Sequence, residues 1–205
     1  MRQATGKTNP PESGYKVSIQ QSLDGHSFSL SPLPELPDPE TELEVEVLTP
    51  RTQLVPTDLF AADRAAELLS AAGFALRTDE RAVWSSPVNE AVALMVVPDS
   101  LVKRLEGHTA HLRYSSPLLA MPGLGEKSVW CCCKGSLIYI KVYGAANRLL
   151  LAEVIPAQED SEICYFFERM TAVFPLEEYR LHLTGMVPKK LRKRIGGLFK
   201  KTTCA

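Results

Sequence analysis

The sequence lacks any long apolar stretch. No run approaches the roughly 18 consecutive apolar residues that a membrane-spanning helix needs. Residues 1–14 contain no apolar segment, so they do not resemble a signal peptide. The net charge of −1 gives no overall electrostatic signal for a nucleic-acid or membrane partner. We therefore expect a cytoplasmic protein.

The sequence also lacks spaced cysteines. Three of its five cysteines, Cys131, Cys132 and Cys133, are contiguous on an expected strand, where successive side chains point to opposite faces. Disulfide frameworks and zinc sites both need cysteines at intervals. His108 and His111 follow an expected helix end and have no obvious third ligand nearby. We expect free thiols, a reducing compartment and no metal site.

The strongest pattern that is present lies at residues 128–156. Strand-prone runs alternate with short turns at 134–136 and 144–147, which are rich in Gly, Ser and Asn. This arrangement predicts three consecutive antiparallel strands, and a meander of three strands can hold a sheet together.

The rest of the chain alternates between strand and helix patterns. The first half predicts strands at 15–22, 27–30 and 43–48, a helix between Thr57 and Gly73, strands at 82–85 and 90–97, a short helix at 101–106 and an extended segment at 111–119. In 43–48 the two glutamates alternate with apolar residues, which is typical of a half-solvated edge strand. After the meander we expect a helix that is capped by Asp160 or Ser161 and terminated by Pro175, a strand at 179–183 and a basic helix at 189–199.

The two halves therefore repeat one plan of three strands followed by alternating helices and strands. We predict an α/β protein with mixed sheets. Its expected parts are a disordered lead-in at 1–14, a first domain at 15–120, a linker at 121–127 and a second, incomplete domain at 128–205.

This duplicated plan resembles the actin-like ATPase superfamily, which has two ribonuclease-H-like domains in tandem. The opening VSIQQSLDGHSFSL resembles an uncharacterised Bacteroidetes family, a domain of unknown function with this fold, and the LHLTG segment fits its later half. The resemblance covers residues 15–200. It implies that the second domain is shortened at its C-terminus, with the missing elements trimmed or supplied by another chain.

The resemblance also implies three segments that would contact a nucleotide, and the sequence of each segment departs from the superfamily pattern. Active members carry an Asp-x-Gly-Thr/Ser type of turn in each first hairpin, where the carboxylate serves the metal ion. Here the first turn has adjacent Asp and Gly, the second has no carboxylate, and the adenosine-side glycine pair is reduced to one. We expect no catalytic residue and no bound ATP or Mg²⁺; the weak candidates for cofactor contact are Ser22, Asp24, Gly25, Lys134, Gly135, Ser136, Thr184 and Gly185.

The charge distribution is uneven near the C-terminus. Residues 189–201 carry seven basic side chains and no acidic one. A solvated helix face, a docking surface for a protein partner, and a surface for an anionic membrane or nucleic acid are all compatible with this segment. The leading hypothesis is a non-catalytic scaffold that acts through protein–protein contacts. The alternatives are a nucleotide-binding or kinase-like enzyme with a degenerate phosphate site, and a protein that binds anionic surfaces through this helix.

Overall fold

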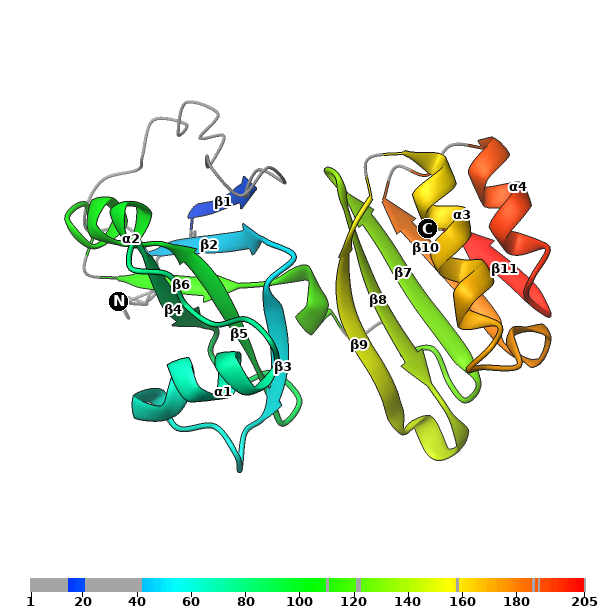
Figure 1. The fold of residues 1–205 in the computed structure, drawn as a ribbon, viewed down its shortest axis with the longest axis horizontal. Helices are drawn as coiled ribbons and strands as arrows, with labels where there is room; N and C mark the ends of the chain where they lie inside the picture. The colour runs from blue at the N-terminus through cyan, green and yellow to red at the C-terminus, as the bar shows by residue number, and fades with distance from the viewer. Residues whose placement is uncertain are drawn as a thin grey trace, which may run out of the picture.

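The chain forms two lobes, seen side by side in the computed structural model (Figure 1). The structure describes the backbone of residues 15–20 and, in full, residues 42–109, 111–120, 123–157, 159–185, 187 and 189–204. Within these segments every helix is too short or too polar to cross a membrane. The expected lead-in at 1–14 and the expected strand at 27–30 lie outside the described residues. The linker expected at 121–127 remains a proposal.

The second lobe contains one five-stranded sheet in the order β11-β10-β7-β8-β9. The predicted meander is confirmed, because its three strands pair antiparallel in sequence order. Strand β10 then pairs parallel with β7, and β11 pairs parallel with β10. The strands are β7 (Ser128–Lys134), β8 (Leu137–Tyr143), β9 (Leu149–Pro156), β10 (Arg180–Gly185) and β11 (Lys201–Cys204).

Helices α3 (Asp160–Met170) and α4 (Lys189–Gly196) cover one face of this sheet (Figure 1). They bury their apolar sides against alternate residues of the strands, as the 3.6-residue and two-residue periods require. The core on this face contains Val129, Cys131, Ile138, Ile140, Val142, Ile163, Cys164, Phe167, Leu181, Leu183, Leu191 and Ile195. Helix α4 ends at Gly196, earlier than predicted, since Gly196 and Gly197 favour leaving the helix. The chain then turns back as β11, which the sequence did not predict.

The first lobe contains two three-stranded sheets. Strands β1 (Tyr15–Gln20), β2 (Leu43–Leu48) and β6 (Leu112–Ser115) are parallel, with β2 in the middle. The second sheet is antiparallel in the order β3-β5-β4, formed by β3 (Thr52–Pro56), β4 (Glu80–Trp84) and β5 (Ala91–Pro98). The helices of the first lobe are α1 (Ala65–Ala71) and α2 (Asp99–Glu106). Four short 3₁₀ turns occur in the described parts of the two lobes: η1 (Ala62–Arg64), η2 (Pro117–Leu119), η3 (Ala145–Asn147) and η4 (Leu176–Glu178).

Three expectations for this lobe are corrected. The strands at 15–20 and 43–48 pair directly and in parallel, which the long connection between them permits. The first half therefore does not begin with an antiparallel meander like that of the second half. Strand β2 is therefore central in its sheet, and the predicted edge strand is wrong. The helix expected from Thr57 begins only at η1, because residues 57–59 form a turn after Pro56.

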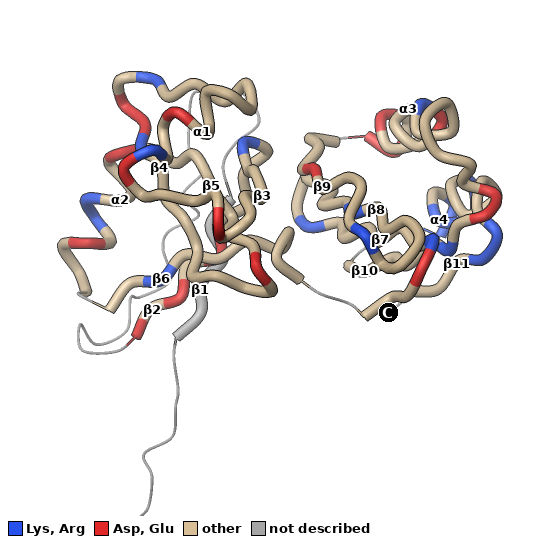
Figure 2. The backbone as a smooth tube through the Cα atoms, turned by 90° about the horizontal axis from the view of Figure 1, so that it is seen from below, with Lys and Arg blue, Asp and Glu red and all other residues tan. Residues whose placement is uncertain are grey.

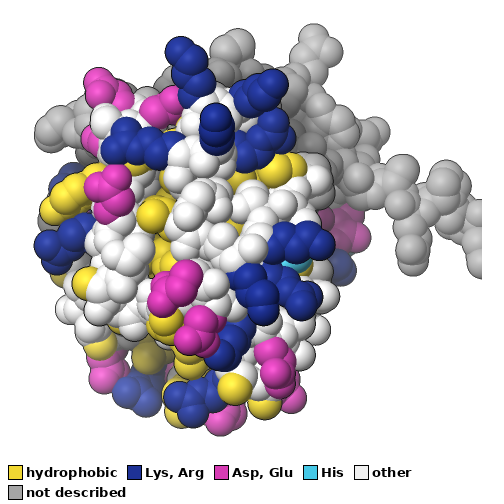
Figure 3. Space-filling view, turned by 90° about the vertical axis from the view of Figure 1, so that its right-hand side faces the viewer, with side chains coloured by type: hydrophobic (Ala, Val, Ile, Leu, Met, Phe, Trp, Pro, Cys, Tyr) yellow, Lys and Arg dark blue, Asp and Glu magenta, His cyan; other side chains and the backbone are white. Residues whose placement is uncertain are grey.

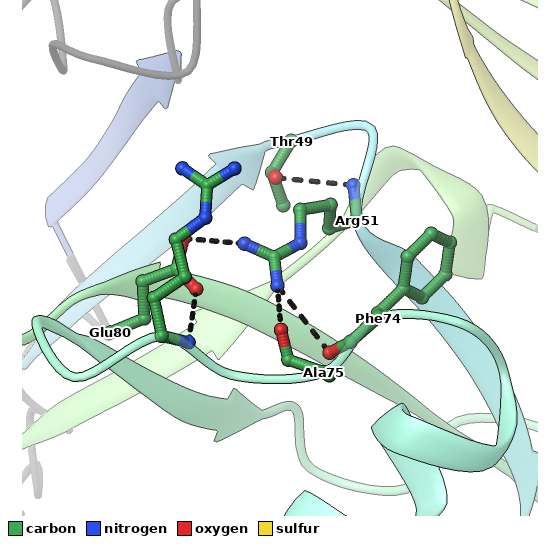
Figure 4. Close-up of polar contacts among 6 residues, drawn as sticks. Thr49, Arg51, Phe74, Ala75 and Glu80 are labelled. Carbon is green, nitrogen blue, oxygen red and sulfur yellow. Dashed lines mark hydrogen bonds and ion pairs between the residues drawn. The ribbon is translucent and has the colours of Figure 1, made fainter.

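Arg51 fixes the connection between β2 and β3 (Figure 4). Its guanidinium forms an ion pair with Glu80 and donates hydrogen bonds to the backbone oxygens of Ala75, at 2.5 Å, and Phe74, at 3.4 Å. Its backbone N–H donates to Thr49 Oγ1 at 3.3 Å. One side chain therefore ties the β2–β3 turn to the loop after α1 and to β4. This clamp holds the part of the first lobe that faces β9.

Candidate functional site: the contact between the lobes

The face of the second sheet that points away from α3 and α4 meets the first lobe. Because side chains alternate along a strand, Leu137 and Tyr139 of β8 lie on this face together with Trp130 of β7. Leu48 of β2 and Leu118 of η2 pack against them. The resulting cluster, which we call the inter-lobe cluster, consists of Leu48, Leu118, Trp130, Leu137, Tyr139 and Val154. All six side chains are buried, so apolar atoms fill this contact.

Lys134 crosses from the second lobe to the first. It stands at the end of β7 and forms an ion pair with Glu46 of β2. Lys134 is partly exposed, whereas Glu46 is buried. The pairing of Lys134 with Leu137 leaves Gly135 and Ser136 as a two-residue turn, and Gly135 has the positive φ of +61° that such a turn requires. The second candidate phosphate turn is therefore a tight hairpin whose lysine contacts a carboxylate.

The third candidate nucleotide segment, Thr184 and Gly185, lies at the end of β10 beside β7. The Thr184 hydroxyl donates to the backbone oxygen of Cys131 at 3.4 Å. Gly185 has φ +82°, and a Cβ placed on it would lie 2.1 Å from the backbone oxygen of Cys133. Only glycine permits this approach without a shift of β7. These two residues therefore hold the parallel pair β10–β7 together.

Two groups near the turn at 134–136, the Cys132 thiol and the Tyr139 phenol, are poor nucleophiles. Burial raises the pKa of Cys132, so its thiol stays protonated at neutral pH. Burial also raises the pKa of Tyr139, and the nearby Glu46 carboxylate adds to this shift. The Tyr139 hydroxyl is buried and has no hydrogen-bond partner among the described residues. The surroundings therefore favour the neutral forms of both groups.

A polar cavity of about 400 Å³ borders Glu46 on the side of the first lobe. Its polar walls come from Glu44 and Glu46 on β2 and from Asn89, Ser115 and Ser116. The Ser115 hydroxyl donates to Glu44 at 2.8 Å. The alternation in 43–48 predicts a solvated face for both glutamates, and the structure differs because Glu46 pairs with a residue 88 positions away in the chain. No local signal in the sequence points to that pair.

Two of the three predicted nucleotide segments lie side by side, because Gly185 of β10 pairs with Cys133 of β7, the residue before Lys134. Ser22, Asp24 and Gly25 lie outside the described residues. The Lys134 side chain pairs with Glu46 of β2, while Thr184 and Gly185 pair with Cys132 and Cys133 at the end of β7. Among the residues that the structure describes, no group of three or more His, Cys, Asp or Glu side chains is arranged to hold a metal ion.

Basic residues occur along α4 and β11 (Figure 2), and basic side chains gather on this side of the molecule (Figure 3). The apolar residues of α4, Leu191 and Ile195, are buried in the core, as is Phe199 after it. Arg194 forms an ion pair with Glu168 of α3 at 3.1 Å. The exposed basic residues of this surface are Lys189, Lys190, Lys193, Arg194, Lys200 and Lys201. The apolar stripe predicted for this helix thus packs on its own lobe.

The chain has the actin-like ATPase fold, with mixed α/β sheets in two lobes. A solved structure from Bacteroides thetaiotaomicron, a protein of unknown function with this fold, matches with a TM-score of 0.67 and 19% sequence identity. The match covers 80% of this chain and 68% of that protein, and it confirms the fold expected from the resemblance.

The other comparisons add little. The cytoplasmic domain of EpsL, an inner membrane component of the type II secretion system of Vibrio cholerae, matches with a TM-score of 0.40 and 10% identity. That match covers 82% of this chain and 66% of that domain, and it is too distant to carry an argument. No protein-family model and no curated protein matches the sequence.

Proposed function

We propose that the protein is a cytoplasmic, non-catalytic actin-like scaffold that acts through contacts with a protein partner. The observation that carries this proposal is the contact between the lobes, where active relatives hold a nucleotide. Apolar side chains fill this contact, and Lys134 of the phosphate-side turn is paired with Glu46. Phosphoryl transfer depends on a metal ion and on donors that are free to contact phosphate. A turn whose lysine already forms an ion pair suits a structural role better than phosphate binding.

Thermal unfolding with ATP and Mg²⁺ tests this proposal. A ligand that binds only the native state at about 100 times its Kd stabilises that state by about 2.7 kcal/mol. For a chain of this size, such stabilisation raises Tm by several degrees. We expect no shift in Tm with millimolar ATP and Mg²⁺, measured by circular dichroism against Mg²⁺ alone. A rise that depends on ATP concentration would refute the scaffold and favour the nucleotide-binding alternative.

A second candidate function rests on the basic surface over α4 and β11. Its exposed cations would bind an anionic membrane or nucleic acid, with an affinity that falls steeply as salt is added. The test measures binding to phosphatidylserine vesicles and to a DNA duplex at several salt concentrations. The variant changes Lys189, Lys190 and Lys193 to Glu. The control variant makes the same change at Lys103 and Arg104 on α2. Binding that ignores salt, or that both variants weaken equally, would exclude this function.

A further inference from the structure

A cavity of about 700 Å³ lies in the first lobe, along the edge of β4 that faces β6, next to the bridge between Ser85 and Tyr114. Strands β4 and β6, helix α2 and the segment before η1 line it. None of its lining residues belongs to the inter-lobe cluster, so it is distinct from the contact between the lobes. Its volume falls in the range of about 300–1,000 Å³ that is usual for small-molecule sites.

One end of the cavity is aromatic. Phe60 and Trp84 line it, with ring centroids 5.7 Å apart and planes tilted by 53°. Val92 adds to the apolar wall. Trp84 remains 39% exposed, although a ring of this size gains from burial against a flat partner. A planar apolar molecule would cover the surface that these two rings leave open.

The polar end of the cavity lies on the face of the sheet opposite Trp84 and holds an unsatisfied hydroxyl. The Tyr114 hydroxyl is buried and has no hydrogen-bond partner among the described residues. Arg81 and Glu106, which influence it electrostatically, are bonded to other groups. Arg81 pairs with Asp99 at 2.6 Å and with Glu106 at 3.3 Å. Buried polar groups in native proteins nearly always have partners, so a hydroxyl without one calls for an explanation.

The backbone of β4 offers further hydrogen-bonding groups. Ser85 N donates to Ala93 O and Asp99 N donates to Asp79 O, so the odd-numbered residues of β4 face β5. The N–H and C=O of Ala82 therefore point to the opposite side, toward β6. Ala82 also lines the cavity. The side of the cavity formed by β4 thus presents a backbone donor and a backbone acceptor.

We propose that this cavity binds a neutral, flat aromatic molecule that carries a hydrogen-bond acceptor such as a carbonyl oxygen. The aromatic part packs against Phe60 and Trp84, and the acceptor receives the Tyr114 hydroxyl. The ligand is neutral because the charged groups at the polar end are already paired with one another. A phosphorylated ligand would meet the Glu106 carboxylate without a free cation to balance it. The site is independent of the proposed scaffold function.

Fluorescence titration with prodan, a neutral naphthalene ketone, tests this proposal on the full chain. We expect saturable binding, a blue shift of prodan emission and energy transfer from Trp84. Tyr114→Phe keeps the ring but removes the hydroxyl. We expect it to weaken binding about threefold to tenfold, which is the change in affinity that loss of one hydrogen bond produces. Ser86→Phe, at the exposed rim of the cavity, should block binding. The matched control is Tyr165→Phe, an exposed tyrosine on α3, which should leave the affinity unchanged.

Two tryptophan variants show where prodan binds. Trp84→Phe should abolish the energy transfer, whereas Trp130→Phe, in the inter-lobe cluster, should preserve it. The opposite pattern would place prodan between the lobes and overturn the proposal. Equal affinity of wild type and Tyr114→Phe, or undiminished binding to a folded Ser86→Phe variant, would also overturn it. If Tyr114→Phe does not fold, the Ser86→Phe and tryptophan variants still decide the question.

Discussion

Lys141 makes the stability of the protein depend on pH in the alkaline range. Its side chain is on β8 beneath η2, and the residue is only 2% exposed. Its ammonium group donates to the backbone oxygen of Ala120 at 2.8 Å and lies 5.8 Å from the centre of the Trp130 ring. Burial nevertheless lowers the pKa of Lys141 from 10.5 to about 8. The contacts therefore only partly replace the water that the ammonium loses on folding.

The sign of the effect follows from proton counts. Between pH 8 and 10.5 the unfolded chain keeps the proton on Lys141, while the folded chain has lost it. Stability rises with pH wherever the unfolded state binds more protons. The full shift corresponds to about 3 kcal/mol, of which about 2 kcal/mol is gained between about pH 7 and pH 9.5. The range stops there because buried tyrosines, such as Tyr114 with a pKa of about 12, would reverse the trend at higher pH.

Urea unfolding followed by circular dichroism measures this gain. We expect the free energy of unfolding of wild type, minus that of Lys141→Met, to become more favourable by about 2 kcal/mol across this range. Methionine fills a similar volume and carries no proton, so it cancels the contributions of all other titrating groups. A difference that stays flat, or that falls as pH rises, would refute the assignment of a depressed pKa to Lys141.

Three further changes test the contacts that hold the lobes and the second sheet. Gly185→Ala should lower the free energy of unfolding by about 3 kcal/mol or more, because the new Cβ would collide with Cys133 O and because the residue has a positive φ. A loss below about 1 kcal/mol in urea unfolding would contradict this close approach. Tyr139→Phe should stabilise the protein by about 1 kcal/mol, since the buried hydroxyl has no described partner, and destabilisation in the same assay would reveal one. A double-mutant cycle of Glu46→Gln and Lys134→Met should give a coupling of about 1 kcal/mol that shrinks with salt, and zero coupling would remove the ion pair from the inter-lobe contact.

The second sheet was predictable because its signals are local. The runs at 128–156 are separated by turns whose residues allow the required backbone angles, such as the positive φ of Gly135. Helix α3 begins at Asp160, one residue earlier than the predicted cap at Asp160 or Ser161 implies, because Glu159 is the N-cap and forms a capping box with Glu162. In both cases a few neighbouring residues decide the structure.

The elements that were missed depend on distant partners. Strand β11, with the sequence KTTC, is too short and polar to stand out, and its pairing with β10 makes it a strand. Strand β3 ends in Pro56 and pairs with β5, about forty positions further along the chain. Glu46 was predicted to face solvent because alternation identifies the two faces of a strand but not what covers each face. Its burial follows from the docking of the second lobe, which one strand's pattern cannot report.

The filled contact between the lobes also limits the affinity for a nucleotide. Seating one there would separate Leu48 and Leu118 from Leu137 and Tyr139. Exposing part of four such side chains costs about 1 kcal/mol each, so opening the contact costs about 4 kcal/mol. That cost is subtracted from the binding free energy, and it would turn a micromolar intrinsic Kd, worth about 8 kcal/mol, into a millimolar apparent one. The same four side chains that weaken a nucleotide keep the two lobes in one arrangement. A fixed arrangement of lobes is what a scaffold needs in order to present one surface to its partner.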